Sequence, residues 1–488
     1  MGVAQGVFAF KVQLDDGVRD CITGRAGLPI LAELMRAAVP RSFHEALARS
    51  LGYRSWKVVR RHVESLALLI AAGGECVDDL RMLRADVGLC ALIGYRPSGT
   101  SQAKEFLYRF HQSAQGARLA PQDDDALSIV GKAQIRPEGP GLRALGAVCS
   151  RVLGVLQARR PHTRATLDVD ATIIEAMKKR ALKAYEGTVG YQPQMAWWAE
   201  QGAWVVDQFR DGNVPAEFEA REFLQFAFGG LPSGITERRL RGDSALYNEK
   251  ALTWADEEDI EFAVSADMSP DLDKRVRALS EASWKPYRAI KPHEAQANAR
   301  EERQWAEVEF IPEWGRNHKK DGTPFRYLAI RVRSKQRELF VAEDNTWRHF
   351  AVVTNMDWTD GERLLRWHRE KQGTVEHGHG DVKNELAGGT LPCGRFGSNA
   401  AWWRLNVLTH NLFALLKATA LPAELSTARP KALRFRLFNV AGRVLRHGRQ
   451  TVLRVCSLVP TAALYIRARR AVLDLAAAFR AAPSPAPA

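Results

Sequence analysis

The sequence predicts an α/β protein in which helices cover the faces of a mixed β-sheet. Residues 164–265 read as strands bounded by turns, with three strands in succession before strands and helices alternate. Residues 1–150 instead repeat apolar positions at the spacing of helices. A chain of 488 residues is long for one hydrophobic core, so we expect two to four domains.

The composition favours a polyanionic partner in a reducing compartment. The chain has 70 Lys and Arg against 56 Asp and Glu, a net charge of +14, although many basic proteins bind no nucleic acid. None of its 6 cysteines forms a Cys-x-x-Cys pair, which argues against a zinc ribbon or a redox motif. No signal peptide and no apolar run of about 18 residues is apparent, so we expect a cytoplasmic protein without membrane contact.

Residues 1–160 are expected to form a mainly helical region. Apolar residues at helical spacing over 28–40 and 43–74 predict two helices, and two glycines end the second. A Pro-Ser-Gly turn and a Ser/Thr cap then predict a further helix within 94–113. Short helices with basic faces suit DNA binding, and a plain helical domain is the alternative.

The sheet domain is expected to occupy 161–265 and 349–420, interrupted by a β-rich insertion over 266–348. Within its second part, 349–358 reads as a buried strand. Thr359 and Glu362 then form a capping box, so a helix should begin there.

Two later segments complete the predicted organisation. Residues 398–418 are expected to be an amphipathic helix that covers the sheet. Residues 421–488 form a basic C-terminal region with a disordered tail, because 431–470 hold ten Lys or Arg and no Asp or Glu. We favour phosphate contact for this block over a solvated face.

The stretch TLDVDATIIEA, residues 166–176, carries the main functional signal. Asp168 and Asp170 share one strand face with Thr166 and Thr172. Two carboxylates on a buried strand are costly unless a positive group lies beside them. The alternative is an edge strand with both aspartates in water.

The motif Asp168-x-Asp170-x-Thr172 resembles the first motif of the haloacid dehalogenase superfamily. That resemblance implies a phosphohydrolase whose first aspartate attacks a phosphate. It extends to Gly242-Asp243-Ser244, but the acid expected four residues after the aspartate is Tyr247 here.

The chain more closely resembles DDE transposases of bacterial insertion sequences, in the group with a β-rich insertion between the second Asp and the Glu. Asp170 is followed by Thr172 on a strand, Asp243 ends a later strand, and Glu376 precedes Lys383 by seven residues. The resemblance implies an RNase H-like mixed sheet, and it extends to the N-terminal and C-terminal regions. A spacing of seven places Glu376 and Lys383 on one helix face.

The resemblance implies a set of metal ligands and a set of DNA contacts. Asp170, Asp243 and Glu376 would be the catalytic residues and would hold two Mg²⁺ ions, with Mn²⁺ as a substitute. The DNA-binding positions would be Lys383, Lys371, Arg369 and Gln372. Gln372 stands where the family has Arg, and Arg369 stands where it has Tyr, so contacts that position the DNA strand differ here.

The implied activity is metal-dependent cleavage and strand transfer at the terminal inverted repeats of the element. The partners would be those repeats and target DNA, bound by a homodimer associated with the nucleoid. A catalytically weakened or non-catalytic DNA-binding relative remains an alternative.

Two further sets of side chains could serve a DNA-cleaving site. His377 and His379 point to different sides of a helix, so we expect them to be exposed or to face phosphate rather than to bind metal. Trp305, Trp314 and Trp347 could stack on a flipped base or pack in a core.

Overall fold

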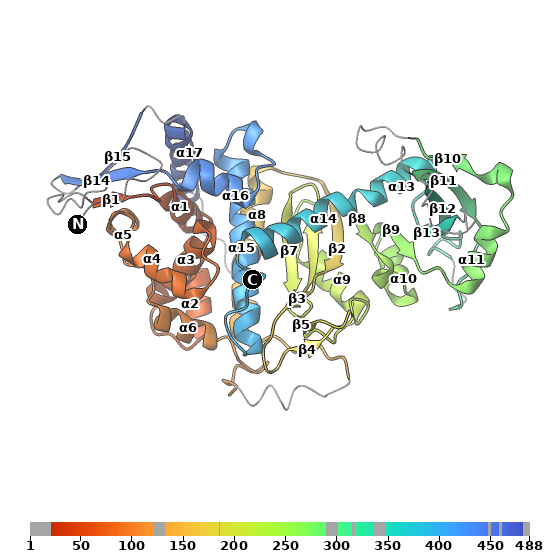
Figure 1. Ribbon diagram of the computed structural model, residues 1–488, viewed down its shortest axis with the longest axis horizontal. Helices are drawn as coiled ribbons and strands as arrows, with labels where there is room; N and C mark the ends of the chain where they lie inside the picture. The colour runs from red at the N-terminus through yellow and green to blue at the C-terminus, as the bar shows by residue number, and fades with distance from the viewer. Residues whose placement is uncertain are drawn as a thin grey trace, which may run out of the picture.

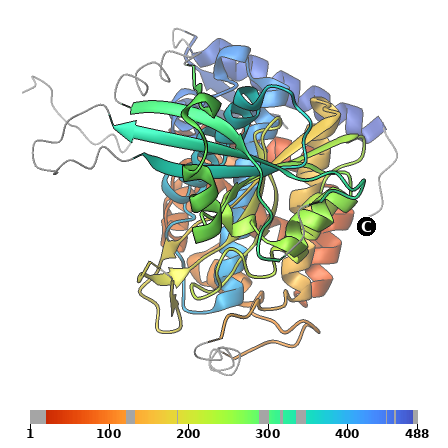
Figure 2. The same ribbon diagram turned by 90° about the vertical axis from the view of Figure 1, so that its right-hand side faces the viewer.

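The structure is a computed structural model that describes residues 21–120, 132–184, 186–288, 301–314, 318–334, 347–447, 450–457 and 461–481. The predicted disordered tail lies almost wholly outside these ranges. In Figure 1 the N-terminal helices lie on one side of a long central helix, and the large sheet lies on the other. Figure 2 looks onto the strands at the far end of that sheet.

A nine-stranded mixed sheet organises the larger half of the molecule, as the sequence predicts. Its strands lie, from edge to edge, in the order β10 (Lys285–Pro286), β11 (Glu301–Val308), β12 (Arg326–Ser334), β13 (Arg348–Thr354), β9 (Glu261–Ala266), β8 (Glu237–Gly242), β2 (Arg164–Ala171), β6 (Gln194–Trp198) and β7 (Ala203–Gln208). Strand β2 is parallel to β8, and β8 is parallel to β9, whereas every other neighbouring pair is antiparallel.

The region 266–348 adds strands to this same sheet. Strand β13 pairs with β9 on one side and with β12 on the other, so β10, β11 and β12 continue the sheet outward. Helix α9 (Ala220–Gly229), α10 (Glu249–Glu257) and α11 (Pro270–Arg277) connect or flank the strands. A small separate sheet, β3 (Ile174–Glu175), β5 (Val189–Tyr191) and β4 (Leu182–Lys183), follows β2 directly.

The N-terminal region is helical, as predicted. Its helices are α1 (Leu28–Ala38), α2 (Arg41–Ser50), α3 (Trp56–Ala72), α4 (Leu80–Ala85), α5 (Val87–Ile93), α6 (Thr100–Tyr108) and α8 (Pro140–Arg159). Residues 43–74 hold two helices rather than one, because the chain turns at Gly52, which has a φ of 69°. Gly73 ends α3 in the left-handed conformation, as expected. The cap of α6 is Gly99 rather than Ser or Thr, and its N–H donates to Gln102 Oε1 at 3.0 Å.

The predicted amphipathic helix over 398–418 is α15 (Phe396–Ala420), but it is buried on all sides. It packs against α8 and β7 on one side and against α3, α6, α1 and α17 (Thr461–Ala481) elsewhere. The N-terminal and C-terminal helices therefore cover the face that the sequence assigned to solvent, which Figure 1 shows. No helix in the described ranges is long and apolar enough to cross a lipid bilayer.

Two helices precede α15 and lie across the sheet. The capping position of α13 (Gly361–Arg369) is Asp360 rather than Thr359, and its side chain accepts from Arg363 N–H at 3.1 Å. Helix α14 (Lys371–Gly380) continues directly into a wider turn over Asp381–Glu385. The expectation of helix through this glycine-containing stretch is therefore confirmed.

The basic C-terminal region is largely structured. Strand β1 (Cys21–Thr23) pairs with the hairpin of β14 (Gly442–His447) and β15 (Gln450–Val455), while α16 (Pro430–Leu433) and α17 flank them. Arg443 lies directly opposite Arg454 across the hairpin, and both side chains are exposed.

Arg404 of α15 joins three parts of the chain in the core. Its guanidinium donates to Asp207 Oδ1 on β7 at 3.0 Å, to Glu138 Oε2 at 2.9 Å and to the Leu142 carbonyl at 2.8 Å. The Arg404 and Asp207 side chains are only 3% and 4% exposed. Burial raises the pKa of Asp207, although Arg404 acts in the opposite direction.

We expect Arg404→Leu to lower the free energy of unfolding by about 3–5 kcal/mol, because it leaves Asp207 charged and buried without a partner. Arg469→Leu is the matched control, since Arg469 pairs with Glu33 at the surface and should cost less than about 1 kcal/mol. Urea unfolding of both variants measures the difference. Equal, small losses would show that the buried ion pair contributes no more than the exposed one.

Buried histidines should make the fold sensitive to acid. Burial lowers the pKa of His44 and of His62 to about 4, from an ordinary value near 6.5. The unfolded chain therefore binds these protons first, and stability falls as the pH drops from about 6.5 towards 4, by roughly 2–3 kcal/mol for each histidine. His62→Gln should flatten this part of the stability profile. A profile with the same slope in His62→Gln would contradict this assignment.

Candidate active site

The site is built on the register between two parallel strands. Asp168 of β2 lies directly opposite Arg241 of β8. The same offset carries Asp170, two residues further on, towards Asp243, which follows the end of β8. Because the carboxyl ends of parallel neighbours meet at one edge of the sheet, the two aspartates converge there.

Asp168 is fully buried and is neutralised by Arg241. The guanidinium Nε and Nη2 donate to the two carboxylate oxygens at 2.6 and 2.9 Å, and both side chains are at most 2% exposed. Burial raises the pKa of Asp168, while Arg241 opposes that rise. The positive partner that a buried strand aspartate requires is therefore Arg241, and the edge-strand alternative is excluded.

Arg241 and Asp168 also hold the helices that cross the sheet. Arg241 Nη1 donates to the Trp367 carbonyl at 2.7 Å and to Glu370 Oε2 at 3.2 Å, at the junction of α13 and α14. Thr374 of α14 donates its hydroxyl to Asp168 Oδ2. Helix α14 is thus fixed against the strand that carries both aspartates.

Lys371 lies between Asp170 and Asp243. Its Nζ is 3.4 Å from a carboxylate oxygen of each. Burial raises the pKa of Asp170 to about 6, and Asp243 adds to this rise while Lys371 opposes it. Burial would lower the pKa of Lys371, but Asp170 and Asp243 outweigh it and raise that pKa. The carboxylates of Asp170 and Asp243 therefore both lie next to the Lys371 ammonium.

The local backbone fixes Asp243 after β8 ends. Its carboxylate accepts from the N–H of Ala245 at 3.1 Å and caps a short helical turn. The side chain is half exposed, whereas that of Asp170 is 20% exposed. The pair therefore has a buried member and an open member, and the open one faces solvent.

His379 is buried, so the expectation that it is exposed or faces phosphate is wrong; His377 is exposed, as expected. The imidazole of His379 lies 5.0 Å from the Trp204 ring, and its Nε2 is 3.7 Å from Asp170 Oδ2. Burial lowers the pKa of His379 to about 3. The helix lies close to the sheet because residue 378 is glycine: a Cβ there would be 2.8 Å from the Trp204 ring.

Three other predicted site residues lie on the helices that cross the sheet, α13 and α14. Glu376, Arg369 and Gln372 are exposed. In the described parts of the chain, no three His, Cys, Asp or Glu side chains are grouped closely enough to share a metal ion. The structure thus brings Asp170 and Asp243 together and leaves Glu376 exposed on the helix that carries Lys371.

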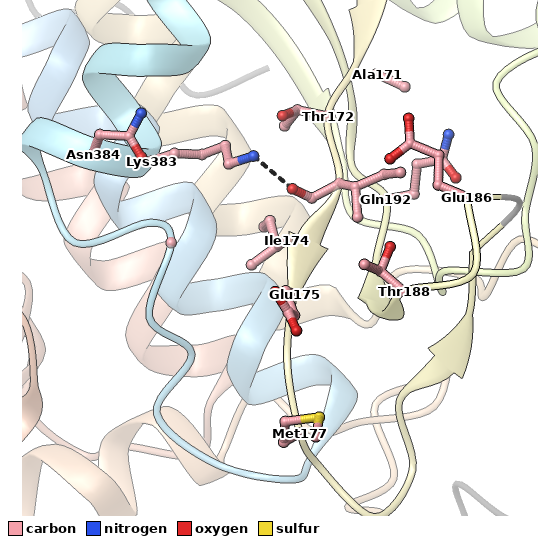
Figure 3. A pocket seen from close by; sticks show the side chains of 12 residues that line it. Ala171, Thr172, Ile174, Glu175, Met177, Glu186, Thr188, Gln192, Lys383 and Asn384 are labelled. Carbon is pink, nitrogen blue, oxygen red and sulfur yellow. Dashed lines mark hydrogen bonds between the residues drawn. The ribbon is translucent and has the colours of Figure 1, made fainter.

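Lys383 lies in the wide turn that follows α14 and reaches the chain just beyond the end of β2. Its Nζ donates to the Ile173 carbonyl at 2.6 Å, and burial lowers its pKa. Figure 3 shows this side chain extending from its helix to the segment that carries Thr172 and Ile174. Together they line a pocket of about 730 Å³ that begins directly after Asp170.

The three tryptophans of the 266–348 region and its border occupy different environments. Trp305 is buried and forms part of a small core. Trp314 lies 4.9 Å from the Tyr247 ring, and Trp347 lies under the guanidinium of Arg331 at 4.3 Å. Core packing is therefore confirmed for Trp305.

Sequence reasoning missed the roles of Arg241, Thr374 and His379. The pairing of Arg241 with Asp168 could have been predicted from the sequence, because Arg241 stands two residues before Asp243 just as Asp168 stands two before Asp170. Nothing in the sequence indicates the roles of Thr374 and His379, because the face of α14 that is buried depends on its contacts with β2 and β6.

The chain matches one known protein family over most of its length. The search of curated proteins finds no match. Among solved structures, a piggyBac transposase synaptic complex with hairpin DNA is 9% identical, with a TM-score of 0.42, covering 96% of this chain and 85% of that one. Residues 11–477 match the family described as Transposase DDE domain group 1. The chain therefore belongs to the DDE transposases of that group.

Proposed function

We propose that this protein binds the terminal inverted repeats of its element and cleaves DNA there in a metal-dependent reaction, followed by strand transfer. The observation that carries the proposal is the convergence of Asp170 and Asp243 on one cation position, at 3.4 Å from Lys371 Nζ in each case. Membership of the DDE transposase family supports the same chemistry.

The proposed catalytic core is RNase H-like. Its five strands would be β7, β6, β2, β8 and β9, which are adjacent in that order, with β2 antiparallel to β6 and parallel to β8. Strands β10 to β12 would be the β-rich insertion, and the helices before β2 would contact DNA. We place the protein in the cytoplasm, at the nucleoid, as a homodimer on paired DNA ends.

Asp170 and Asp243 fit a divalent metal ion, although no third acidic or histidine side chain is grouped with them closely enough to share that ion in the described parts of the chain. Carboxylate oxygens are the donors that Mg²⁺ and Mn²⁺ prefer, and Asp170 and Asp243 already face a shared positive charge. Asp170 would hold both ions, Asp243 would hold one, and Glu376 would hold the other. Bound there, the ions would activate the attacking water and stabilise the leaving oxygen.

The positive charge of Lys371 would partly neutralise Asp170 and Asp243 before DNA binds. Its ammonium lies 3.4 Å from an oxygen of each carboxylate and opposes the rise in the pKa of Asp170, and a DNA phosphate is an alternative anion for the same group. Water would attack the phosphorus as the bond to the 3′ oxygen breaks, leaving a 3′ hydroxyl on the element. That hydroxyl would then attack a target phosphate at the same residues, and the bond from that phosphorus to the 3′ oxygen of the target strand would break, leaving a 3′ hydroxyl on the target.

Two other functions are weighed against this one. A haloacid dehalogenase-like reaction requires Asp168 as an accessible nucleophile, whereas Asp168 is fully buried and paired with Arg241. A non-catalytic DNA-binding relative is favoured by one observation: Glu376 is exposed, and in the described ranges no three potential ligands are grouped closely enough to share a metal ion. Binding to the flanking DNA without any cut would identify such a relative.

The first test is cleavage of a labelled duplex that carries the gene's own flanking DNA, with Mg²⁺ or Mn²⁺. Asp170→Asn, Asp243→Asn and Glu376→Gln should each lower the cleavage rate about a hundredfold or more, because each removes a charged ligand. Their melting temperatures should stay close to that of wild type. Full cleavage by Glu376→Gln would remove that residue from the proposed site.

Asp168→Asn should behave differently from the three ligand variants. Removal of its charge leaves Arg241 buried without its partner, so the free energy of unfolding should fall by about 3 kcal/mol or more. Thermal unfolding separates this loss from a catalytic one. A stable Asp168→Asn protein without cleavage activity, together with an Asp170→Asn protein that still cleaves, would make Asp168, not Asp170, the metal ligand.

Lys383 is proposed to contact a phosphate near the cut. Lys383→Ala should then reduce the slope of binding affinity against salt concentration by about one, as expected when one phosphate contact is lost. Lys250→Ala provides the control, because Lys250 is an exposed lysine on α10. Fluorescence anisotropy over a salt series measures both slopes, and equal slopes would argue against the contact.

A further inference from the structure

The ammonium of Lys371 stands in the place that an ion shared by Asp170 and Asp243 would need. It lies 3.4 Å from a carboxylate oxygen of each aspartate. The lysine side chain is only 11% exposed, so the ammonium is held within the group rather than in solvent. An ion bound by both carboxylates would also lie between them, because oxygen ligands approach Mg²⁺ to about 2.1 Å. The ammonium and such an ion therefore exclude each other.

The surroundings of Lys371 make it an effective competitor for that place. Its Nζ donates to Asp243 Oδ2 and is paired with Asp170 Oδ1, so one cation serves two carboxylates. Water screens charges less inside a protein than at its surface, which strengthens both attractions. A divalent ion that entered while the ammonium stayed would meet a like charge within a few ångströms. Binding of the ion therefore requires Lys371 to leave, and the cost of its leaving lowers the affinity for the ion.

The position of Lys371 in the fold allows its ammonium to leave the pair. Lys371 is the first residue of α14, directly after the junction with α13, and its four-carbon stem is flexible. The side chain of Asp243 is half exposed, so the group is open to solvent on that side. A DNA phosphate that arrives there offers the ammonium another anion. Lys371 can then leave both carboxylates without losing a negatively charged partner.

We propose that Lys371 is a built-in competitor of the metal, which keeps divalent ions away from Asp170 and Asp243 until a DNA phosphate draws its ammonium out. The inference rests on the proposed function, because it requires both aspartates to be metal ligands. Metal and DNA would then bind cooperatively, since each favours the state in which the ammonium has left the carboxylates. The DNA-free protein would bind divalent ions weakly.

The first test measures Mn²⁺ binding to the full chain without DNA, from the electron paramagnetic resonance signal of the free ion. Lys371→Met should raise the Mn²⁺ affinity about tenfold or more, because it removes the competing charge and leaves both carboxylates in place. Lys371→Arg keeps the charge and should stay close to wild type. Lys417→Met is the matched control, because Lys417 lies on α15 and donates to the Ala428 carbonyl. Adding Asp170→Asn to Lys371→Met should abolish the gain.

A second measurement uses the unaltered protein, so that it stands even if Lys371→Met fails to fold. Acetic anhydride modifies lysine side chains that reach solvent, and mass spectrometry gives the extent of modification at each lysine. Lys371 should react slowly in the protein alone and severalfold faster at saturating Mn²⁺, because the ion sends its ammonium into solvent. The modification of Lys417 should be the same with and without Mn²⁺.

The outcomes separate this inference from the proposed function. Equal Mn²⁺ affinities of wild type and a folded Lys371→Met protein would overturn the inference. Mn²⁺ binding that leaves the modification of Lys371 unchanged would overturn it as well. Either result would leave metal-dependent cleavage intact. If neither wild type nor Lys371→Met bound Mn²⁺, with or without the flanking DNA, the proposed metal-dependent function would fail together with the inference.

Discussion

The pairing of Asp168 with Arg241 is the interaction on which the rest of the site depends. It places a neutralised ion pair in the middle of the sheet and sets the register of β2 against β8. The same guanidinium holds the junction of α13 and α14 through the Trp367 carbonyl. Removing either partner leaves a buried charge, so strand register and helix position are fixed together. Asp170 and Asp243 then converge because both are two residues beyond this pair.

A second constraint joins the N-terminal half of the molecule to the sheet. Helix α15 is buried on every side, and Arg404 on it binds Asp207 of β7 and Glu138 near the start of α8. The proposed DNA-binding helices and the candidate active site are therefore parts of one packed body. DNA held by the N-terminal helices would approach the aspartates in an orientation that this shared core determines.

The sequence predicted well which strands carry the aspartates, and it predicted poorly what the helix that crosses the sheet contacts. Alternation along β2 placed Asp168 and Asp170 on one face, and the position of Asp243 at a strand end brought it to the same edge. The burial of His379 could not be predicted, because it depends on how closely Gly378 allows α14 to approach Trp204. The burial of α15 on all sides could not be predicted from its own sequence pattern either, because helices that are distant in the sequence cover its second face.

The long separation between the aspartates and Lys371 has a consequence for how the protein is made. Lys371 lies 128 residues beyond Asp243, so at ribosomal speeds of about 5–20 residues per second it is synthesised roughly 6–25 s later. Until then Asp170 and Asp243 have no cation between them, and Asp168 lacks Thr374. A nascent chain that ends within the insertion therefore cannot assemble the site, and the order of translation delays activity until the crossing helix has emerged.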